Sequence, residues 1–196
     1  MGNYSITTLG AATELLSLPL DQPLAEWTDP RIVQVPRGIS RHVVRFVRAQ
    51  NQIFAFKEAT TRYVLREHHL LRELADASVP VVDAFGTVID RTDSDGQPLE
   101  SLLITRHLPY SLPYRSLFTE RSLPDLRSRL LDALAQLFVR LHLAGFFWGD
   151  CSLSNTLFRR DAGSLAAYLV DAETGETHAT LTTGQRSHDL TIATEN

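Results

Sequence analysis

The alternation of apolar and polar residues predicts a sheet in the first half of the chain. From Arg31 onward, short runs rich in β-branched and aromatic residues are separated by proline, glycine and polar residues, which is typical of strands. We predict hairpin-connected strands at about 41–49 and 52–58, with a weaker strand near 31–35. Two further strands are expected in VPVVDAFGTVID and LESLLITRHL, which the turn-rich stretch TDSDGQP joins.

Helical spacing replaces this alternation in two places. The stretch TRYVLREHHLLRELADA carries its apolar residues at helical spacing, and Pro80 stops it. The clearest helix is expected at 123–143, with Ser122 as its N-cap and Gly145 at its end. Its apolar stripe comprises Leu126, Leu130, Leu134, Leu137, Phe138 and Leu141. A polar loop and the hairpin NTLFRRDAGSLAAYLVD follow this helix, so the order of elements predicts an α+β fold.

Composition narrows the function classes. The chain has 196 residues, 43% hydrophobic and 21% charged, which suits one domain or two small lobes. A net charge of −4 gives no reason to expect nucleic acid or an anionic membrane as a partner. No apolar run approaches the ~20 residues of a membrane-spanning helix. The single cysteine, Cys151, excludes an internal disulfide framework, and no secretory signal opens the chain, so we expect a cytoplasmic location.

One basic residue differs in type from all the others. Lys57, in the apolar run IFAFKEA, is the only lysine, and the other 18 of the 19 basic residues are arginines. A coding bias toward arginine would leave such a lysine by drift. Alternatively, this position requires a compact ammonium group rather than a planar guanidinium fork.

A set of oxygen-bearing residues in the second half favours the second interpretation. Asp150 and Asn155 lie in the loop after the long helix, and Asp171 ends the following hairpin. Phosphoryl transfer from a nucleotide needs a carboxylate for the acceptor hydroxyl, oxygen ligands for Mg²⁺, and a cation on the phosphates. Asp150 fits the first requirement, Asn155 and Asp171 fit the second, and Lys57 fits the third.

These motifs resemble the catalytic and metal-binding loops of the protein-kinase-like superfamily. The matching positions are Leu141, His142, Gly145, Asp150, Asn155, Leu157 and Asp171. Trp148-Gly149 replaces the usual His-Arg, and Asp171-Ala172-Glu173 replaces Asp-Phe-Gly, so the chain is more similar to the atypical Rio and aminoglycoside-phosphotransferase kind. Longer phrases, such as FFWGDCSLSNTLFRRDAG, resemble a bacterial family labelled lipopolysaccharide-kinase-like.

The resemblance implies a two-lobe kinase-like fold with an incomplete C-terminal lobe. An N-terminal extension would occupy 1–30, the small lobe 31–108, and the partial large lobe 109–196. Glu67 would be the ion-pair partner of Lys57, with Glu73 as its competitor. The resemblance also implies that Asp189 anchors the catalytic loop, that His142 has a structural role beneath it, and that cofactor contacts come from Gly38, Thr105 and His107.

The implied activity is transfer of a phosphoryl group from ATP, with Mg²⁺, to a hydroxyl of an unidentified acceptor. Lys57 would hold the phosphates, Asp150 would act as the base, and Asn155 and Asp171 would hold the metal. The alternative is a non-catalytic, nucleotide-binding regulatory module. It is motivated by the absence of a full glycine-rich loop around Gly38 and by the end of the chain seven residues after Asp189.

Overall fold

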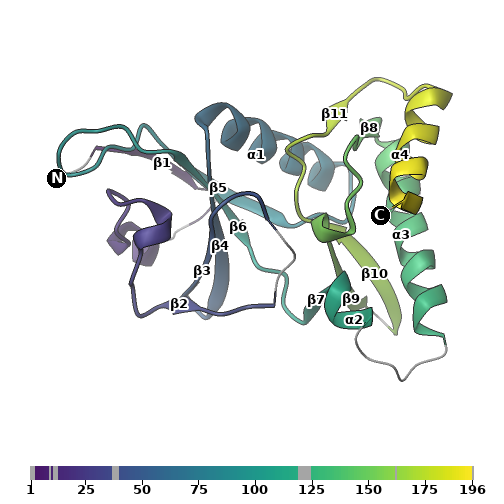
Figure 1. Cartoon of the computed structure of the whole chain (residues 1–196), viewed down its shortest axis with the longest axis horizontal. Helices are drawn as coiled ribbons and strands as arrows, with labels where there is room; N and C mark the ends of the chain where they lie inside the picture. The colour runs from purple at the N-terminus through teal and green to yellow at the C-terminus, as the bar shows by residue number, and fades with distance from the viewer. Residues whose placement is uncertain are drawn as a thin grey trace. The chain divides into compact units, whose positions relative to one another are not determined.

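The computed structural model describes residues 3–8, 10, 13–36, 40–118, 125–161 and 163–195, and these form two compact units. Unit 1 comprises the described residues within 1–35, 40–69 and 83–107. Unit 2 comprises those within 36–39, 70–82 and 108–196. Unit 1 carries the sheet that the sequence predicts in the first half, and unit 2 carries the long helix and the hairpin (Figure 1).

Unit 1 is built on an antiparallel sheet of six strands in the order β1-β5-β6-β4-β3-β2. The strands are β1 (Ser5–Thr8), β2 (Ile32–Val33), β3 (Val44–Ala49), β4 (Gln52–Ala59), β5 (Asp83–Ile89) and β6 (Ser101–Arg106). The four main predicted strands are therefore confirmed. Strand β3 begins later than expected, because its pairing with β4 ends where Val44 lies opposite Lys57.

The N-terminal residues, predicted as an extension, are part of unit 1. Strand β1 pairs with β5, and the short 3₁₀-helices η1 (Thr13–Ser17) and η2 (Leu24–Glu26) follow it. Apolar side chains of this segment are buried in the core of the sheet, namely Leu15, Leu18, Leu20, Leu24 and Trp27. The close approach of β1 also explains Gly86 in β5, where a Cβ atom would lie 2.3 Å from the Thr7 carbonyl oxygen.

Helix α1 (Thr61–Asp76) forms where helical spacing predicts it, and its buried apolar side chains are Val64, Leu70, Leu71 and Leu74. The division between the units falls after His69, so the last part of α1 and residues 77–82 belong to unit 2 rather than to the predicted small lobe. Backbone hydrogen bonds account for this. The Val82 N–H donates to the Leu169 carbonyl, and the Leu169 N–H donates to the Pro80 carbonyl, both at 3.0 Å.

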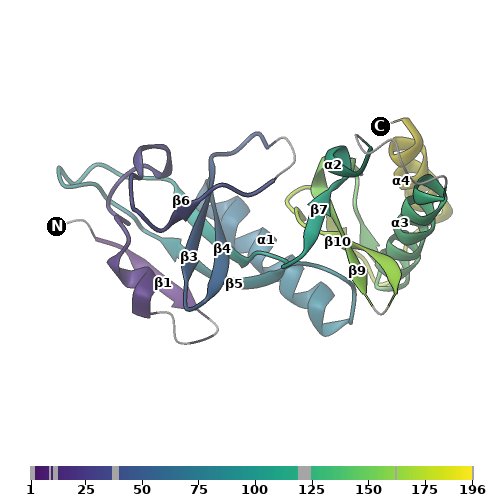
Figure 2. The same ribbon diagram turned by 90° about the horizontal axis from the view of Figure 1, so that it is seen from below.

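Unit 2 combines helices with two small sheets, ordered β10-β9-β7 and β11-β8. Its elements are β7 (Ser111–Pro113), α2 (Tyr114–Phe118), α3 (Leu126–Leu143), β8 (Phe146–Phe147), η3 (Leu153–Asn155), β9 (Thr156–Asp161), β10 (Ser164–Leu169), β11 (Glu176–Thr177) and α4 (Thr183–Glu195). Helix α3 packs along β10 (Figures 1 and 2). None of the helices in the described part of the chain has both the length and the apolar character needed to cross a membrane.

The long helix has the predicted apolar face and the predicted end. Its buried side chains are Leu130, Ala133, Leu137, Phe138 and Leu141. Gly145 follows it with φ of 73°, and a Cβ atom there would lie 2.0 Å from the His178 carbonyl oxygen. The helix is observed from Leu126, and the predicted N-cap Ser122 lies outside the described residues.

Candidate active site

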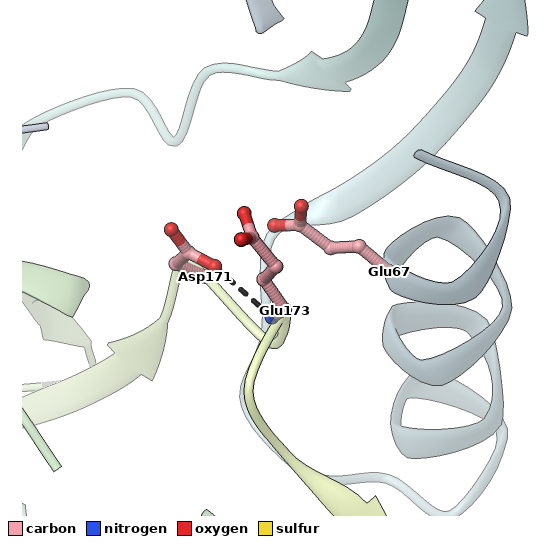
Figure 3. Close-up of side chains that lie close together, drawn as sticks. All are labelled: Glu67, Asp171 and Glu173. Carbon is pink, nitrogen blue, oxygen red and sulfur yellow. Dashed lines mark hydrogen bonds between the residues drawn. The ribbon is translucent and has the colours of Figure 1, made fainter. Parts of the chain in front are cut away.

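The lysine that stands out in the sequence forms an ion pair in unit 1. Lys57 lies on β4, opposite Val44 of β3 and Leu103 of β6, so strands on both sides fix its backbone. Its Nζ atom lies 2.9 Å from Oε2 of Glu67. Figure 3 shows the Glu67 side chain extending from α1. The Glu67 side chain is only 2% exposed and that of Lys57 only 12%. Water therefore screens this pair less than a surface ion pair.

The structure separates the two glutamates that compete for Lys57. Glu67 and Glu73 lie six positions apart on α1, so they do not share the same helix face. Glu73 instead accepts a hydrogen bond of 3.3 Å from the Thr177 hydroxyl in unit 2. The predicted ion pair of Lys57 with Glu67 is thus present.

The remaining predicted cofactor contacts of unit 1 lie on or next to β6. Thr105 is half-buried and pairs with Ala55 of β4 and Ala84 of β5. His107 follows the strand, and its N–H donates to the Ile53 carbonyl at 2.8 Å. Burial lowers the pKa of His107, so its ring is neutral near pH 7. Gly38 lies outside the described residues.

In unit 2, a buried aspartate holds the loop that carries Asp150. Asp189 on α4 is fully buried, and its carboxylate accepts hydrogen bonds from the backbone N–H groups of Trp148 (3.1 Å) and Gly149 (2.8 Å). The His142 ring, at the end of α3, lies 3.0 Å from the same carboxylate. Gly149 has φ of 77°, a conformation that favours glycine, and the following Asp150 is exposed. The anchoring role expected of Asp189 and the structural role expected of His142 match these contacts.

The cysteine next to Asp150 is not arranged as a nucleophile. The Cys151 side chain is buried, and burial raises its pKa, as do the negative charges of Asp189 and Asp150. A thiol with a raised pKa has little reactive thiolate at neutral pH. This agrees with the interpretation of Cys151 as a small loop residue.

The two predicted metal ligands are neighbours across the β9–β10 hairpin. Thr156 pairs with Leu169, and one step further the Val170 N–H donates to the Asn155 carbonyl at 2.9 Å. Asn155 therefore ends η3 opposite the residue that precedes Asp171. The Asp171 carboxylate accepts a hydrogen bond of 3.0 Å from the Glu173 backbone N–H (Figure 3). Both side chains are half-buried.

Local backbone structure explains how the loop reaches this hairpin. The Ser152 side chain caps η3 by accepting from the Ser154 N–H at 3.2 Å, and the Asn155 N–H donates to the Ser152 carbonyl at 2.9 Å. Asp150, Asn155 and Asp171 thus come from one short loop and one hairpin end of unit 2. Sequence reasoning missed the backbone link between Asn155 and Val170, although counting pairs back from the hairpin turn would have revealed it.

Comparison with known proteins agrees with these motifs. The family model described as "Lipopolysaccharide kinase (Kdo/WaaP) family" matches residues 39–192. The solved structure titled "WaaP in complex with acyl carrier protein" superposes with a TM-score of 0.57 at 19% sequence identity. That match covers 84% of this chain and 69% of the WaaP chain, and it shows a shared kinase-like fold. A search of curated protein sequences found no match.

Proposed function

Because the chain belongs to the Kdo/WaaP lipopolysaccharide kinase family, we propose that it transfers the γ-phosphoryl group of ATP, with Mg²⁺, to a hydroxyl group. The observation that carries the proposal is the ion pair of Lys57 with the buried Glu67. Phosphoryl transfer relies on positioning and on charge stabilisation, so a rigidly held ammonium group is the kind of residue it needs. Lys57 would contact the ATP phosphates, and Glu67 would orient it.

Within this proposal, Asp150 acts on the acceptor. Its carboxylate is exposed, whereas the loop behind it is fixed by Asp189. An exposed carboxylate on a rigid loop can accept a hydrogen bond from an acceptor hydroxyl and take its proton as the hydroxyl oxygen attacks phosphorus. Lys57 would then act on the phosphoryl donor and Asp150 on the acceptor hydroxyl.

The donor atoms of Asn155 and Asp171 fit a hard divalent cation. Both side chains offer oxygen ligands, and the Val170–Asn155 hydrogen bond holds their backbones at one end of the hairpin. Mg²⁺ held there would neutralise charge on the ATP phosphates. The chain would keep the backbones of these two residues together, and the Glu173 N–H, which donates to Oδ1 of Asp171, would orient that carboxylate.

The family description suggests the acceptor to test first, which is a sugar hydroxyl of a lipopolysaccharide. ATP as the donor would place the reaction in the cytoplasm. The second candidate function is a nucleotide-binding module that lacks turnover. It differs from the kinase only in what Asp150 does, because both functions use Lys57 and the metal ligands.

The test compares wild type with Asp150→Asn. ATP and Mg²⁺ should raise the melting temperature of both proteins, because Asp150 is not assigned to nucleotide binding. Turnover of ATP with a lipopolysaccharide acceptor should be present in wild type and lost in Asp150→Asn. Asp132→Asn, on the exposed face of α3, is the matched control and should behave as wild type.

The outcomes separate the alternatives. Stabilisation by ATP without turnover in any variant would favour the binding module. The absence of stabilisation by ATP in both wild type and Asp150→Asn would contradict both functions.

A further inference from the structure

We propose that residues 13–27, here called the N-terminal brace, position Lys57 through a buried link between Glu58 and Arg91. The effect on catalysis rests on the function proposed above, whereas the effect on Lys57 itself does not. The family match begins at residue 39, so the brace lies outside the matched region. Arg91 and Glu58 are proposed as positioning residues, since neither is assigned a contact with ATP or the acceptor.

The first step is the alternation of side chains along β4. Neighbouring residues of a strand point to opposite faces of the sheet, so Lys57 points toward α1 and Glu58 points to the other face. That other face carries Phe54 and Phe56, which are buried in the same core as the brace leucines. The Trp27 ring packs on Phe56 with 5.3 Å between ring centroids. The brace therefore covers the face of β4 that lies opposite to the Lys57 side chain.

The second step is the buried arginine that joins the brace to β4. Arg91 is 1% exposed, and its Nη1 atom lies 2.9 Å from the Glu58 carboxylate. Its remaining donors bond three backbone carbonyls, at Leu20 (2.9 Å), Glu100 (2.5 Å) and Gln22. A buried charge is tolerated only when it is paired and hydrogen-bonded, and this guanidinium meets both conditions. Two of the three carbonyls belong to the brace.

The third step is a direct contact between the brace and Glu58. The same Glu58 oxygen that accepts from Arg91 also accepts from the Leu24 N–H at 3.0 Å. The brace thus supplies two carbonyl acceptors to the buried Arg91 and one N–H donor to the half-buried Glu58. Such a network has one well-satisfied arrangement, and any shift leaves buried polar groups without partners. Glu58 is consequently fixed, and the adjacent Lys57 is fixed with it through the β3–β4–β6 ladder.

The uniqueness of Lys57 gives a direct measurement. With isotope-labelled lysine, NMR reports a single side-chain ammonium group, because the chain has no other lysine. We expect Arg91→Met to shift or broaden this resonance, since the Lys57–Glu67 pair loses its fixed geometry. We also expect the KM for ATP to rise about tenfold or more, with a smaller change in kcat at saturating ATP.

Arg31→Met is the matched control. Arg31 bonds the Glu14 carbonyl at 2.7 Å and the Asp29 carboxylate at 2.7 Å, so it also ties the N-terminal segment together, but it does not reach β4. This variant should leave the lysine resonance and the KM for ATP unchanged. All spectra and kinetics are to be recorded below the onset of thermal unfolding of each variant.

Arg91→Met leaves the half-buried Glu58 carboxylate without its cationic partner and can prevent folding. In that case Arg91→Lys and Glu58→Gln replace it, since both retain part of the network. The proposal holds if the lysine resonance moves in folded Arg91 or Glu58 variants but not in Arg31→Met. An unchanged resonance in those folded variants overturns it. If the resonance moves but no variant, wild type included, turns over ATP, the brace stands and the proposed kinase function fails.

Discussion

Lys57 and Asp150 are held in place by different physical means. Lys57 lies in a regular ladder between two strands, and its side chain forms an ion pair with the buried Glu67. Asp150 lies in an irregular loop, and its position depends on hydrogen bonds from Trp148 and Gly149 to the buried Asp189. Repetitive strand pairing holds the backbone of Lys57, whereas local turn hydrogen bonds and the carboxylate of Asp189, distant in sequence, hold the loop of Asp150.

This difference predicts how substitutions near Lys57 and near Asp150 change stability and activity. Removing one side chain near Lys57 leaves the ladder in place, so its backbone should stay fixed while its charge loses orientation. Removing Asp189 leaves two backbone donors without an acceptor in the interior of unit 2. We therefore expect substitution of Asp189 to affect both stability and activity, and substitution of Glu67 to affect activity more than stability.

The largest effect is expected for Asp189→Ala. It should destabilise the protein by about 3–5 kcal/mol, because the buried Trp148 N–H and the part-buried donors of Gly149 and His142 lose their shared acceptor. Turnover should fall to background as the loop releases Asp150. Chemical denaturation and ATP turnover measure these changes. A folded variant of normal stability would contradict the anchoring role of Asp189.

A smaller loss of stability is expected for Gly145→Ala, at the turn that leads from α3 toward the loop. The backbone has φ of 73° there, and the new Cβ would meet the His178 carbonyl, so we expect a cost of about 3 kcal/mol. Gly163→Ala is the control. It has φ of 87° but nothing within 4 Å, so it should cost about 1 kcal/mol. Equal costs in thermal unfolding would show that the close approach to His178 does not matter.

In unit 1, Glu67→Gln should lower the rate of phosphoryl transfer by about ten- to a hundredfold, because the Lys57 ammonium loses the carboxylate that orients it. The change in unfolding free energy should be smaller than for Asp189→Ala. Glu73→Gln, on the same helix, removes a carboxylate that contacts Thr177 instead and should retain activity. Steady-state kinetics of the two variants test whether Glu67 or Glu73 is the functional partner of Lys57. A larger loss of activity in Glu73→Gln would reverse the assignment.

The smallest effect is expected at Cys151. Burial and the nearby charges of Asp189 and Asp150 raise the pKa of its thiol, so thiolate is scarce throughout the neutral range. A thiol reagent should modify the native protein slowly and the denatured protein at the ordinary rate. Rapid modification of the native protein would show that the loop opens, and would weaken the contrast with the rigid ladder around Lys57.

The same contrast explains how much could be predicted from the sequence. Alternation and helical spacing located the main strands of unit 1 and the helices α1 and α3, since these patterns record which face is buried. The Lys57–Glu67 pair and the Asp189 anchor followed from the motif resemblance and not from periodicity. Patterns of this kind do not encode contacts between residues that are far apart in the chain and lack a shared repeat.

The brace was beyond sequence reasoning for the same reason. Leu15, Leu18, Leu20 and Leu24 appeared as an irregular, proline-interrupted segment, without the period of a strand or a long helix. Arg91 appeared as one arginine among eighteen, at the edge of a turn-rich stretch. Only the fold shows that it reaches Glu58 and the Leu20 carbonyl.

The most direct test of the central claim is ATP turnover by Lys57→Arg. The variant keeps the positive charge but replaces a compact ammonium with a planar fork, and we predict a loss of at least about a hundredfold while the fold is retained. Arg48→Lys, at an exposed position on the neighbouring strand β3, is the reverse exchange and should keep full activity. Normal turnover by Lys57→Arg would contradict the account and would leave drift as the explanation for the only lysine.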